Sequence, residues 1–558
     1  MTWEDSVLYL GIDVGTGSTR IGAFMADGTM VGTSSRPIRT MQPRAGYSQQ
    51  STTDIWSAVS GASRSLLADH DLDPVRVKGI GFDATCSLAV VGQGGTKISV
   101  CPDGTAEFDV IVWSDHRAID QANRIQMTGN VALESVGGSI FPEMQLPKLL
   151  WLKQKLPDQF WAAQYFFDLP DWLVYRATGS DIRSLCSATC KWTYQGSRGL
   201  NGEGWAASFL TEIGLGDLVS DKFSSIGSAF VAPGSRIGRG LSASAAQSLG
   251  LMPGTHVAAS LIDAYAGALG TTGVTWPDGL QPEGRLALIA GTSACHIAET
   301  RDATFVPGVW GPYLGVLFPE VWANEAGQSA AGALIDRIMN GHCATPDLRA
   351  RARKNGCNIY DELEELLVAL TGSTDDTHLL TANLHVQPDF MGNRAPLADP
   401  KRRGSISGLT MQADATDLAR QYLATVQALA YGTRQIIGAM RESGIDIRTL
   451  VVSGGLARNT LYLREHADAT GCAILVPNQQ EPVLLGSAML AATAAGRFED
   501  LGAARAEMSG TAHRILPRTG TVARYHNAKY DVFLAMQSHF ADYDQIMSAI
   551  RTEVGNER

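Results

Sequence analysis

The segment of residues 8–28, LYLGIDVGTGSTRIGAFMADG, constrains the fold more than any other part of the chain. Its apolar run Tyr9–Ile12 predicts a buried strand, and Arg20–Met25 predicts a second strand that returns from the turn Gly15–Ser18. Glycine lets a backbone approach a ligand closely, and successive N–H groups with hydroxyls form an anion-sized cradle. Asp13, at the entrance of the turn, has the chemistry to hold hydrated Mg²⁺. The hairpin therefore predicts a nucleotide phosphate site, and an ordinary Gly-rich hairpin turn is the alternative.

Composition limits the class of protein. The chain has 558 residues, of which 45% are hydrophobic and 18% charged, as in a globular protein long enough for two large domains. Its net charge of −11, without a dense Lys/Arg run, argues against a nucleic-acid or anionic-membrane partner. The N-terminal residues lack the features of a signal peptide, and no stretch of about 20 apolar residues predicts a membrane span. The eight cysteines are scattered, so we expect reduced thiols and a cytoplasmic location, with Cys186 and Cys190 as structural residues.

The strand–turn–strand pattern occurs a second time. The apolar run Arg285–Ala290 leads into Gly291-Thr292-Ser293 and then into a short continuation. Two such copies, about half a chain apart, predict two similarly built α/β domains. The segment Gly270–Gly284 is rich in Gly and Pro, so we expect the domains to be residues 1–278 and 279–558.

A third glycine cluster lies in the C-terminal half. Periodic apolar residues predict a long helix over Thr416–Ser443, and Thr449–Ser453 predicts a strand after it. The strand ends at Gly454-Gly455, and the next helix is expected to begin near Arg458-Asn459. Unpaired N–H groups at a helix N-terminus suit a flat or anionic ligand, and a tight turn without a ligand is the alternative.

One carboxylate lies at the end of a predicted strand, beside small residues. Asp263 follows the apolar segment His256–Ile262 and precedes the small-residue helix predicted over Ala264–Gly270, which leaves room for a ligand. Transfer of a γ-phosphoryl group to an alcohol needs an acceptor hydroxyl in line and a carboxylate that accepts its proton late. N-capping of the following helix is the structural alternative for Asp263, and one side chain can serve both roles.

Taken in chain order, these motifs resemble those of the FGGY carbohydrate kinases. The resemblance extends from Leu8 to about Gly496. It rests on GIDVGTGSTR (11–20), WSDHRA (113–118), LIDAYAGALG (261–270), GTSACH (291–296), EAGQSAAG (325–332), VVSGGLARN (451–459) and EPVLLGSAMLAA (481–492). It implies an α/β fold of two ribonuclease-H-like domains, as in actin-like ATPases, with ATP and sugar bound in the interdomain cleft.

The resemblance also implies a role for individual residues. Asp263 matches the catalytic base, and Asp13 matches the residue that orients Mg²⁺, usually through water. The positions that match ATP contacts are Gly15, Thr16, Gly17, Ser18, Gly291, Thr292, Ser293, Gly332, Gly454, Gly455 and Asn459. The residues expected to bind the sugar are Asp83, Ser87, Asp115, His116, Glu143, Lys191, Asp263 and Glu325. An internal ion pair or hydrogen-bond network is the alternative for His116 and Arg117.

Within the family, the segment FDATCSLAVV departs from glycerol kinases, which carry an Arg-Glu pair in the matching loop. GTSACH, the tripeptide CKW and EAGQSAAG resemble ribulokinases, and DATCS with PEMQLPKLLWLK resembles the subgroup linked to D-ribulose. The predicted reaction is therefore phosphorylation of the 5-hydroxyl of a ketopentose by ATP and Mg²⁺, with D-ribulose as the first candidate. L-ribulose, xylulose and ribitol are the alternative substrates.

Two other classes of function are the alternatives to a sugar kinase. An actin-like ATPase would not need the WSDHRA segment, and a non-catalytic sugar sensor would not need both Asp13 and Asp263.

Apolar residues at helical spacing predict an amphipathic helix over Tyr525–Ile550. Its apolar stripe can dock on its own domain or against a second subunit, so a homodimer is one of the expected assemblies.

Overall fold

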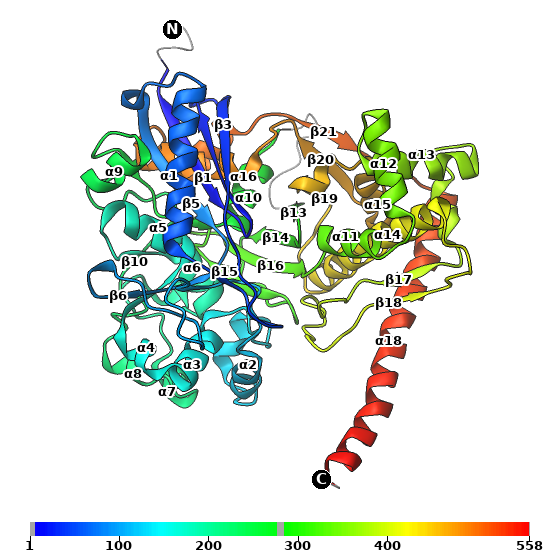
Figure 1. Ribbon diagram of the computed structural model, residues 1–558, viewed down its shortest axis with the longest axis horizontal. Coiled ribbons are helices and arrows are strands. Elements are labelled where there is room, and N and C mark those ends of the chain that lie inside the picture. Colours follow the sequence, from blue (N-terminus) through cyan, green and yellow to red (C-terminus); the bar gives the residue numbers. More distant parts are fainter. Residues whose placement is uncertain (1–5, 276–283, 557–558) are drawn as a thin grey trace. The chain divides into compact units, whose positions relative to one another are not determined.

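The computed structural model describes residues 6–275 and 284–556, which form two compact units (Figure 1). Unit 1 consists of Met1–Glu283, Ile297–Glu325 and Pro477–Ala512. Unit 2 consists of Gly284–His296, Ala326–Val476 and His513–Arg558. The predicted domain boundary between residues 278 and 279 lies outside the described residues, so the division at that point stays a prediction.

The central sheet of unit 1 is built on the N-terminal hairpin. Strands β1 (Leu8–Val14) and β2 (Ser18–Phe24) pair antiparallel around the turn, which confirms the predicted hairpin. Strand β5 (Val77–Ala84) pairs parallel to β1 on its other side. The six strands follow the order β11-β5-β1-β2-β3, with β12 also beside β5. The remaining members are β3 (Met30–Pro37), β11 (His256–Val257) and β12 (Leu261–Ile262).

Helices cover both faces of this sheet, and every residue of β1 is buried. On one face Leu10 and Ile12 join an apolar core with α1 (Thr52–Asp69). On the other face, a Cβ at Gly11 would lie 2.0 Å from the Leu484 carbonyl oxygen of α16 (Pro482–Ala494), so only glycine allows this contact. The large apolar side chains of one face of β1 thus pack against α1, while Gly11 on the other face lets α16 approach the strand closely.

Helix α16 also packs closely on α10 (Asp263–Thr272), the helix that begins with the predicted base. A Cβ at Gly486 would lie 2.0 Å from the Ala266 carbonyl oxygen, and one at Gly270 would lie 1.9 Å from that of Pro482. Although α16 comes late in the chain, it belongs to unit 1. Residues far apart in sequence thus support the start of α10.

A second sheet of unit 1 has the order β4-β7-β6-β8. Its strands are β4 (Gln49–Gln50), β6 (Leu88–Gly92), β7 (Val110–Ile111) and β8 (Ala163–Asp168). The other helices of unit 1 are α2 (Ile119–Gln126), α3 (Gln145–Lys155), α4 (Pro157–Ala162), α5 (Leu169–Thr178), α6 (Leu185–Trp192), α7 (Ala207–Glu212), α8 (Asp217–Ser220), α9 (Ala243–Leu249) and α17 (Leu501–Met508). Strands β15 (Trp310–Leu314) and β16 (Trp322–Gln328) pair antiparallel.

Unit 2 contains the second turn and the third glycine cluster. Strands β13 (Arg285–Ala290), β19 (Thr449–Ser453) and β20 (Ala473–Pro477) are parallel neighbours, and β14 (Ala294–Thr300) follows β13. The predicted long helix and the strand after it are confirmed as α14 (Ala415–Glu442) and β19. The other helices are α11 (Gly332–Asn340), α12 (Thr345–Asn355), α13 (Ile359–Thr371), α15 (Thr460–Thr470) and α18 (Thr521–Asn556).

Helix α18 confirms the predicted C-terminal helix and extends beyond it at both ends. The first part of its apolar stripe is packed, since Phe533 is 3% exposed among residues of α14 and α15. Tyr543 and Ile546, by contrast, are 63% and 64% exposed. Across residues 6–275 and 284–556, no helix combines the length and apolar character needed to cross a bilayer.

Candidate active site

The turn between β1 and β2 presents its backbone to solvent. Gly15 N–H donates to the Ser18 carbonyl at 3.0 Å, and Thr16 and Gly17 at the tip are exposed. Two side chains from other parts of the chain hold the turn in place. Gln50 Nε2 donates to the Thr16 carbonyl at 2.7 Å, and Trp113 Nε1 donates to Thr16 Oγ1 at 3.0 Å. A fixed, exposed, glycine-containing turn of this kind can accept an anion on its free N–H groups.

Asp13 ends up beside a cation that the sequence analysis missed. The carboxylate is 3% exposed, and its Oδ2 accepts hydrogen bonds from Arg20 Nε at 2.9 Å and Nη2 at 2.5 Å. Arg20 Nη1 donates at the same time to Glu481 Oε2 of the segment before α16, at 2.8 Å. The antiparallel register sets Arg20 directly opposite Asp13, so the hairpin pattern itself contained this signal.

Two more carboxylates lie close to Asp13. Asp83 is its neighbour across the β1–β5 pair, is fully buried, and accepts a 2.6 Å hydrogen bond from Ser487 Oγ of α16. Burial, and then the charge of Asp13, raise the pKa of Asp83 well above its usual range.

Asp263 is the first residue of α10, and its Oδ1 accepts a hydrogen bond from the neighbouring Ala264 N–H, at 2.8 Å. The residue before the helix is Ile262, so Asp263 does not occupy the N-cap position. Burial, followed by the charge of Asp13, raises the pKa of Asp263 to about 6. At neutral pH such a carboxylate is mostly ionised and can accept a proton, which suits a general base.

A buried ion pair lies next to Asp263. Lys191 Nζ, at the end of α6, donates to Glu325 Oε1 of β16 at 2.8 Å, and both side chains are at most 4% exposed. The ammonium group also lies 4.3 Å from the ring centroid of Trp310. Burial is the largest single influence and lowers the pKa of Lys191, but the charge and hydrogen bond of Glu325, with the nearby Cys86 and Cys190, together hold it above the usual value.

Glu325 Oε2 has no hydrogen-bond partner although it is buried. Helix α6, which carries Lys191, packs on β12, the strand that ends just before Asp263, and the charges of Lys191 and Glu325 both influence the pKa of Asp263. A buried carboxylate oxygen without a donor is an acceptor for a ligand hydroxyl, since buried polar atoms are rarely left unpaired. The aromatic face of Trp310 and the Lys191–Glu325 pair together have the chemistry that binds a sugar.

Two residues of the WSDHRA segment, Asp115 and Arg117, form a buried ion pair with each other. Arg117 Nε and Nη2 donate to the two oxygens of Asp115 at 2.8 Å each, and Ser48 N–H donates to Asp115 Oδ2 at 2.6 Å. Both side chains are fully buried, and the Arg117 guanidinium lies 4.4 Å from the Tyr47 ring centroid. For Arg117 the structure has the internal ion pair that the sequence left open. Both oxygens of Asp115 serve this pair, and its role toward a sugar stays a prediction.

The remaining predicted sugar contacts lie around a lysine that sequence reasoning missed. Lys148 is fully buried in α3 and donates to the carbonyls of Val112 and Trp113, at 3.2 and 3.3 Å. His116 Nε2 lies 3.8 Å from Glu143 Oε1, and its side chain is 32% exposed. Ser87 Oγ is buried and accepts the Trp113 N–H at 3.1 Å. Nothing in the local sequence distinguishes Lys148 from a surface lysine, because its role depends on carbonyls more than 30 residues away.

In unit 2 the second turn contacts the start of α11. Gly291 N–H donates to the Ser293 carbonyl at 2.9 Å, and Thr292 is exposed at the tip. Gly332 N–H donates to the Gly291 carbonyl at 3.0 Å, and a Cβ at Gly332 would lie 2.7 Å from that oxygen. The structure therefore brings Gly332 to the turn, as expected for residues that meet one ligand.

The glycine cluster after β19 lies against the end of β13. Gly454 has φ +88°, and a Cβ there would lie 2.5 Å from the Ala290 carbonyl oxygen. Gly455 is exposed, with open space where a side chain would be. Asn459 is the N-cap of α15, since its Oδ1 accepts the Tyr462 N–H at 2.8 Å, while its Nδ2 donates to the Tyr422 hydroxyl at 2.6 Å. Its side chain thus shapes the glycine turn, and its contact with ATP stays a prediction.

Comparison with known proteins identifies the family. Residues 8–270 match the N-terminal domain, and residues 286–495 the C-terminal domain, of the FGGY family of carbohydrate kinases. The chain belongs to this family. An FGGY carbohydrate kinase domain-containing protein of Danio rerio is 45% identical over 540 residues, which cover 95% of this chain and 97% of that protein. A D-ribulokinase of Saccharomyces cerevisiae is 38% identical over 522 residues, covering 89% and 73%.

The fold agrees with this assignment. The crystal structure of ligand-bound xylulose kinase from Lactobacillus acidophilus superposes with a TM-score of 0.75 at 18% identity, covering 96% of this chain and 98% of that one. The FGGY kinase fold, with two actin-like, ribonuclease-H-like α/β domains, is thereby confirmed. The protein is a carbohydrate kinase, and kinases of this family use ATP.

Proposed function

We propose that this FGGY kinase transfers the γ-phosphoryl group of ATP to the 5-hydroxyl of a ketopentose, with D-ribulose as the substrate. The observation that carries the proposal is the buried Lys191–Glu325 pair beside Asp263, with Glu325 Oε2 unpartnered. The yeast relative named a D-ribulokinase supports this choice of substrate. L-ribulose, xylulose and ribitol, which differ in stereochemistry or oxidation state at one or two carbons, are the alternatives.

In the proposed reaction Asp263 accepts the proton of the attacking 5-hydroxyl. Its pKa of about 6 keeps it ionised at neutral pH, yet still basic enough to take the proton late in the transfer. Lys191 donates to a sugar oxygen, and Glu325 Oε2 accepts from a sugar hydroxyl. Trp310 provides an apolar wall beside them. These contacts orient the acceptor, which is the main contribution a kinase of this kind makes to the rate.

The glycine turns are proposed to bind the nucleotide. The turns Gly15–Ser18 and Gly291–Ser293, exposed at their tips, offer N–H groups and hydroxyls to phosphates, and Gly455 leaves open space for adenosine. Asp13 fits the proposed site for Mg²⁺, because that ion keeps several waters and needs only one or two carboxylates. Mg²⁺ would supply neutralisation of phosphate charge.

The same proposal includes a cytoplasmic location. All eight cysteines are free thiols, as expected in a reducing compartment.

The test is sugar-dependent ADP release with Mg-ATP and a panel of D-ribulose, L-ribulose, D-xylulose, L-xylulose, ribitol and glycerol. We expect D-ribulose to give the highest kcat/KM. A preference for another pentulose would keep the kinase assignment and change the proposed substrate. ATP turnover at the same rate with every sugar would instead support an ATPase. Sugar binding without any turnover would support a sensor.

Three variants test the assigned roles. Asp263→Asn should lower kcat by about 10²–10⁴-fold with ATP binding preserved, and near-normal turnover would refute the base. Glu325→Gln should chiefly raise KM for the sugar. The neutral amide weakens the pair with Lys191, and its NH₂ group replaces one of the two carboxylate oxygens, so the acceptor proposed for a sugar hydroxyl is lost. Asp13→Ala should shift the Mg²⁺ dependence of the rate. The exposed Asp103→Asn is the matched carboxylate control and should behave as the parent.

A further inference from the structure

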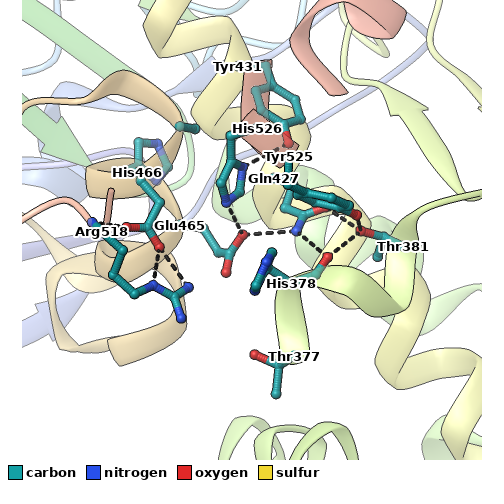
Figure 2. A network of polar contacts seen from close by, with 12 residues as sticks. Thr377, His378, Thr381, Gln427, Tyr431, Glu465, His466, Arg518, Tyr525 and His526 are labelled. Atoms are coloured by element: carbon teal, nitrogen blue, oxygen red, sulfur yellow. Dashed lines mark hydrogen bonds and ion pairs between the residues drawn. The ribbon is translucent and has the colours of Figure 1, made fainter. Parts of the chain in front are cut away.

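A buried cluster of side chains with metal-ligating groups lies in unit 2, on helices α15 and α18, and Figure 2 labels two of its members, Glu465 and His526. Glu465 and Asp468 are three residues apart on α15 and therefore share one face of that helix. His526 comes from the second turn of α18. Glu465 and His526 are fully buried, and Asp468 is 4% exposed.

The ligand atoms of the three residues converge. One nitrogen or oxygen from each lies within 4.8 Å of the others, and His526 Nε2 is 3.8 Å from Glu465 Oε2. That distance is too long for a hydrogen bond. Bonds from Zn²⁺ to nitrogen and oxygen are about 2.0–2.2 Å long, so two ligand atoms on one ion lie roughly 3–4 Å apart. The His526–Glu465 separation already falls in this range.

Two of these atoms have no partner of their own. Glu465 Oε1 and His526 Nε2 are buried and make no hydrogen bond. Buried polar atoms in native proteins are rarely left in this state, and a bound ion is one established reason. A direct proton bridge between the two residues is excluded by the 3.8 Å gap.

Each of the three residues also contacts a polar group outside the cluster, and Figure 2 shows these contacts for Glu465 and His526. The Tyr431 hydroxyl lies 3.0 Å from His526 Nδ1, which leaves Nε2 to face the cluster. Gln427 Nε2 donates to Glu465 Oε2 at 2.9 Å, and Arg518 Nε donates to Asp468 Oδ2 at 2.9 Å. Outer groups that orient a histidine and its neighbouring carboxylates in this way are typical of protein metal sites.

The charges select the kind of ion. Arg518 neutralises Asp468, while Glu465 has no cation in hydrogen-bond contact, so a divalent ion would supply the missing positive charge. An imidazole nitrogen with two carboxylates suits Zn²⁺ and its transition-metal neighbours, whereas Mg²⁺ and Ca²⁺ prefer oxygen alone.

We propose that Glu465, Asp468 and His526 bind one divalent transition-metal ion, of the zinc type, that ties α18 to α15 within unit 2. The role is structural, because the ligands are buried and belong to packed helices. The site is separate from any Mg²⁺ bound with ATP, since it involves neither Asp13 nor the glycine turns.

The test uses the full chain, tag-free, stripped with a chelator and titrated with Co²⁺ and Zn²⁺. We expect one equivalent of Co²⁺ to produce visible d–d bands without the near-ultraviolet band of a thiolate ligand, and Zn²⁺ to displace it. Zn²⁺ should also raise the melting temperature. Less than about a tenth of an equivalent bound, or a spectrum showing thiolate ligands, would overturn the proposal.

Substitutions distinguish metal binding at this site from metal binding elsewhere on the chain. Glu465→Gln keeps the shape of the side chain and an acceptor for Gln427, so it should fold, yet it should weaken Co²⁺ binding by at least tenfold. His526→Gln should do the same. His539→Gln, an exposed histidine on the same helix, is the matched control and should bind as the parent does. Equal binding by all three variants would also overturn the proposal, and the kinase assay is not needed for any of these readouts.

Discussion

Asp168 makes the stability of unit 1 dependent on pH. It ends β8, is 1% exposed, and its Oδ2 accepts hydrogen bonds from Trp192 Nε1 at 2.8 Å and Gln145 Nε2 at 3.0 Å. Burial, and then the charge of Asp171, raise its pKa from 3.8 to about 7. The folded chain therefore holds a proton on Asp168 that the unfolded chain releases at a much lower pH.

The sign and size of the effect follow from this shift. Because the folded-state pKa is the higher one, the stabilisation is complete below about pH 3.8 and is lost as the pH rises through about 7. One pKa unit corresponds to about 1.4 kcal/mol, so the full loss has an upper limit of about 4 kcal/mol. Between pH 5 and pH 8 the loss amounts to about 2–3 kcal/mol by the same relation.

Asp168→Asn removes the ionisation. The amide oxygen can still accept from Trp192 and Gln145, and the cost of its buried NH₂ group does not depend on pH. Relative to the parent, the variant should gain about 2–3 kcal/mol in the free energy of unfolding between pH 5 and pH 8. Other titrating groups are common to both proteins and cancel in the difference.

Urea unfolding followed by tryptophan fluorescence measures this difference. All eleven tryptophans lie in the segments of unit 1, so the signal reports that unit. A difference between variant and parent that stays constant from pH 5 to pH 8 would refute the reasoning. In Asp171→Asn the charge that adds to the shift is gone, so the loss of stability that Asp168 causes should be smaller and fall at lower pH.

Two further substitutions test the packing around α16. Gly486→Ala would place a Cβ 2.0 Å from the Ala266 carbonyl oxygen and should destabilise unit 1 by more than about 2 kcal/mol, whereas Gly61→Ala in α1, where the nearest atom would be 3.7 Å away, should not. An unchanged urea midpoint for Gly486→Ala would show that α10 and α16 can separate at little cost. Ser487→Ala removes the one hydrogen bond that Asp83 receives from Ser487 and should cost about 1–3 kcal/mol, read from the same transition; a loss below about 0.5 kcal/mol would contradict the contact.

The elements that sequence reasoning predicted well are those specified by nearby residues. The hairpin around Gly15–Ser18, the long helix α14 and the strand β19 each follow from an apolar period and a glycine stop, and all three are confirmed. The Arg20–Asp13 contact follows from the same hairpin register and could have been predicted. The closed Asp115–Arg117 pair is also local, but whether such charges face a ligand or each other depends on burial, which the segment alone does not reveal.

The sequence by itself determined the family, the two glycine-containing strand–turn–strand motifs and the position of Asp263 at the start of a helix, because period, turn chemistry and motif order are properties of the chain. Only the tertiary structure decided which side chains work together. Lys191 meets Glu325 across 134 residues, and Ser487 meets Asp83 across 404. The pKa of Asp263 likewise rises through burial and the charge of Asp13, which no local pattern records. Contacts of this range, and the desolvation that comes with them, exist only once the chain has folded.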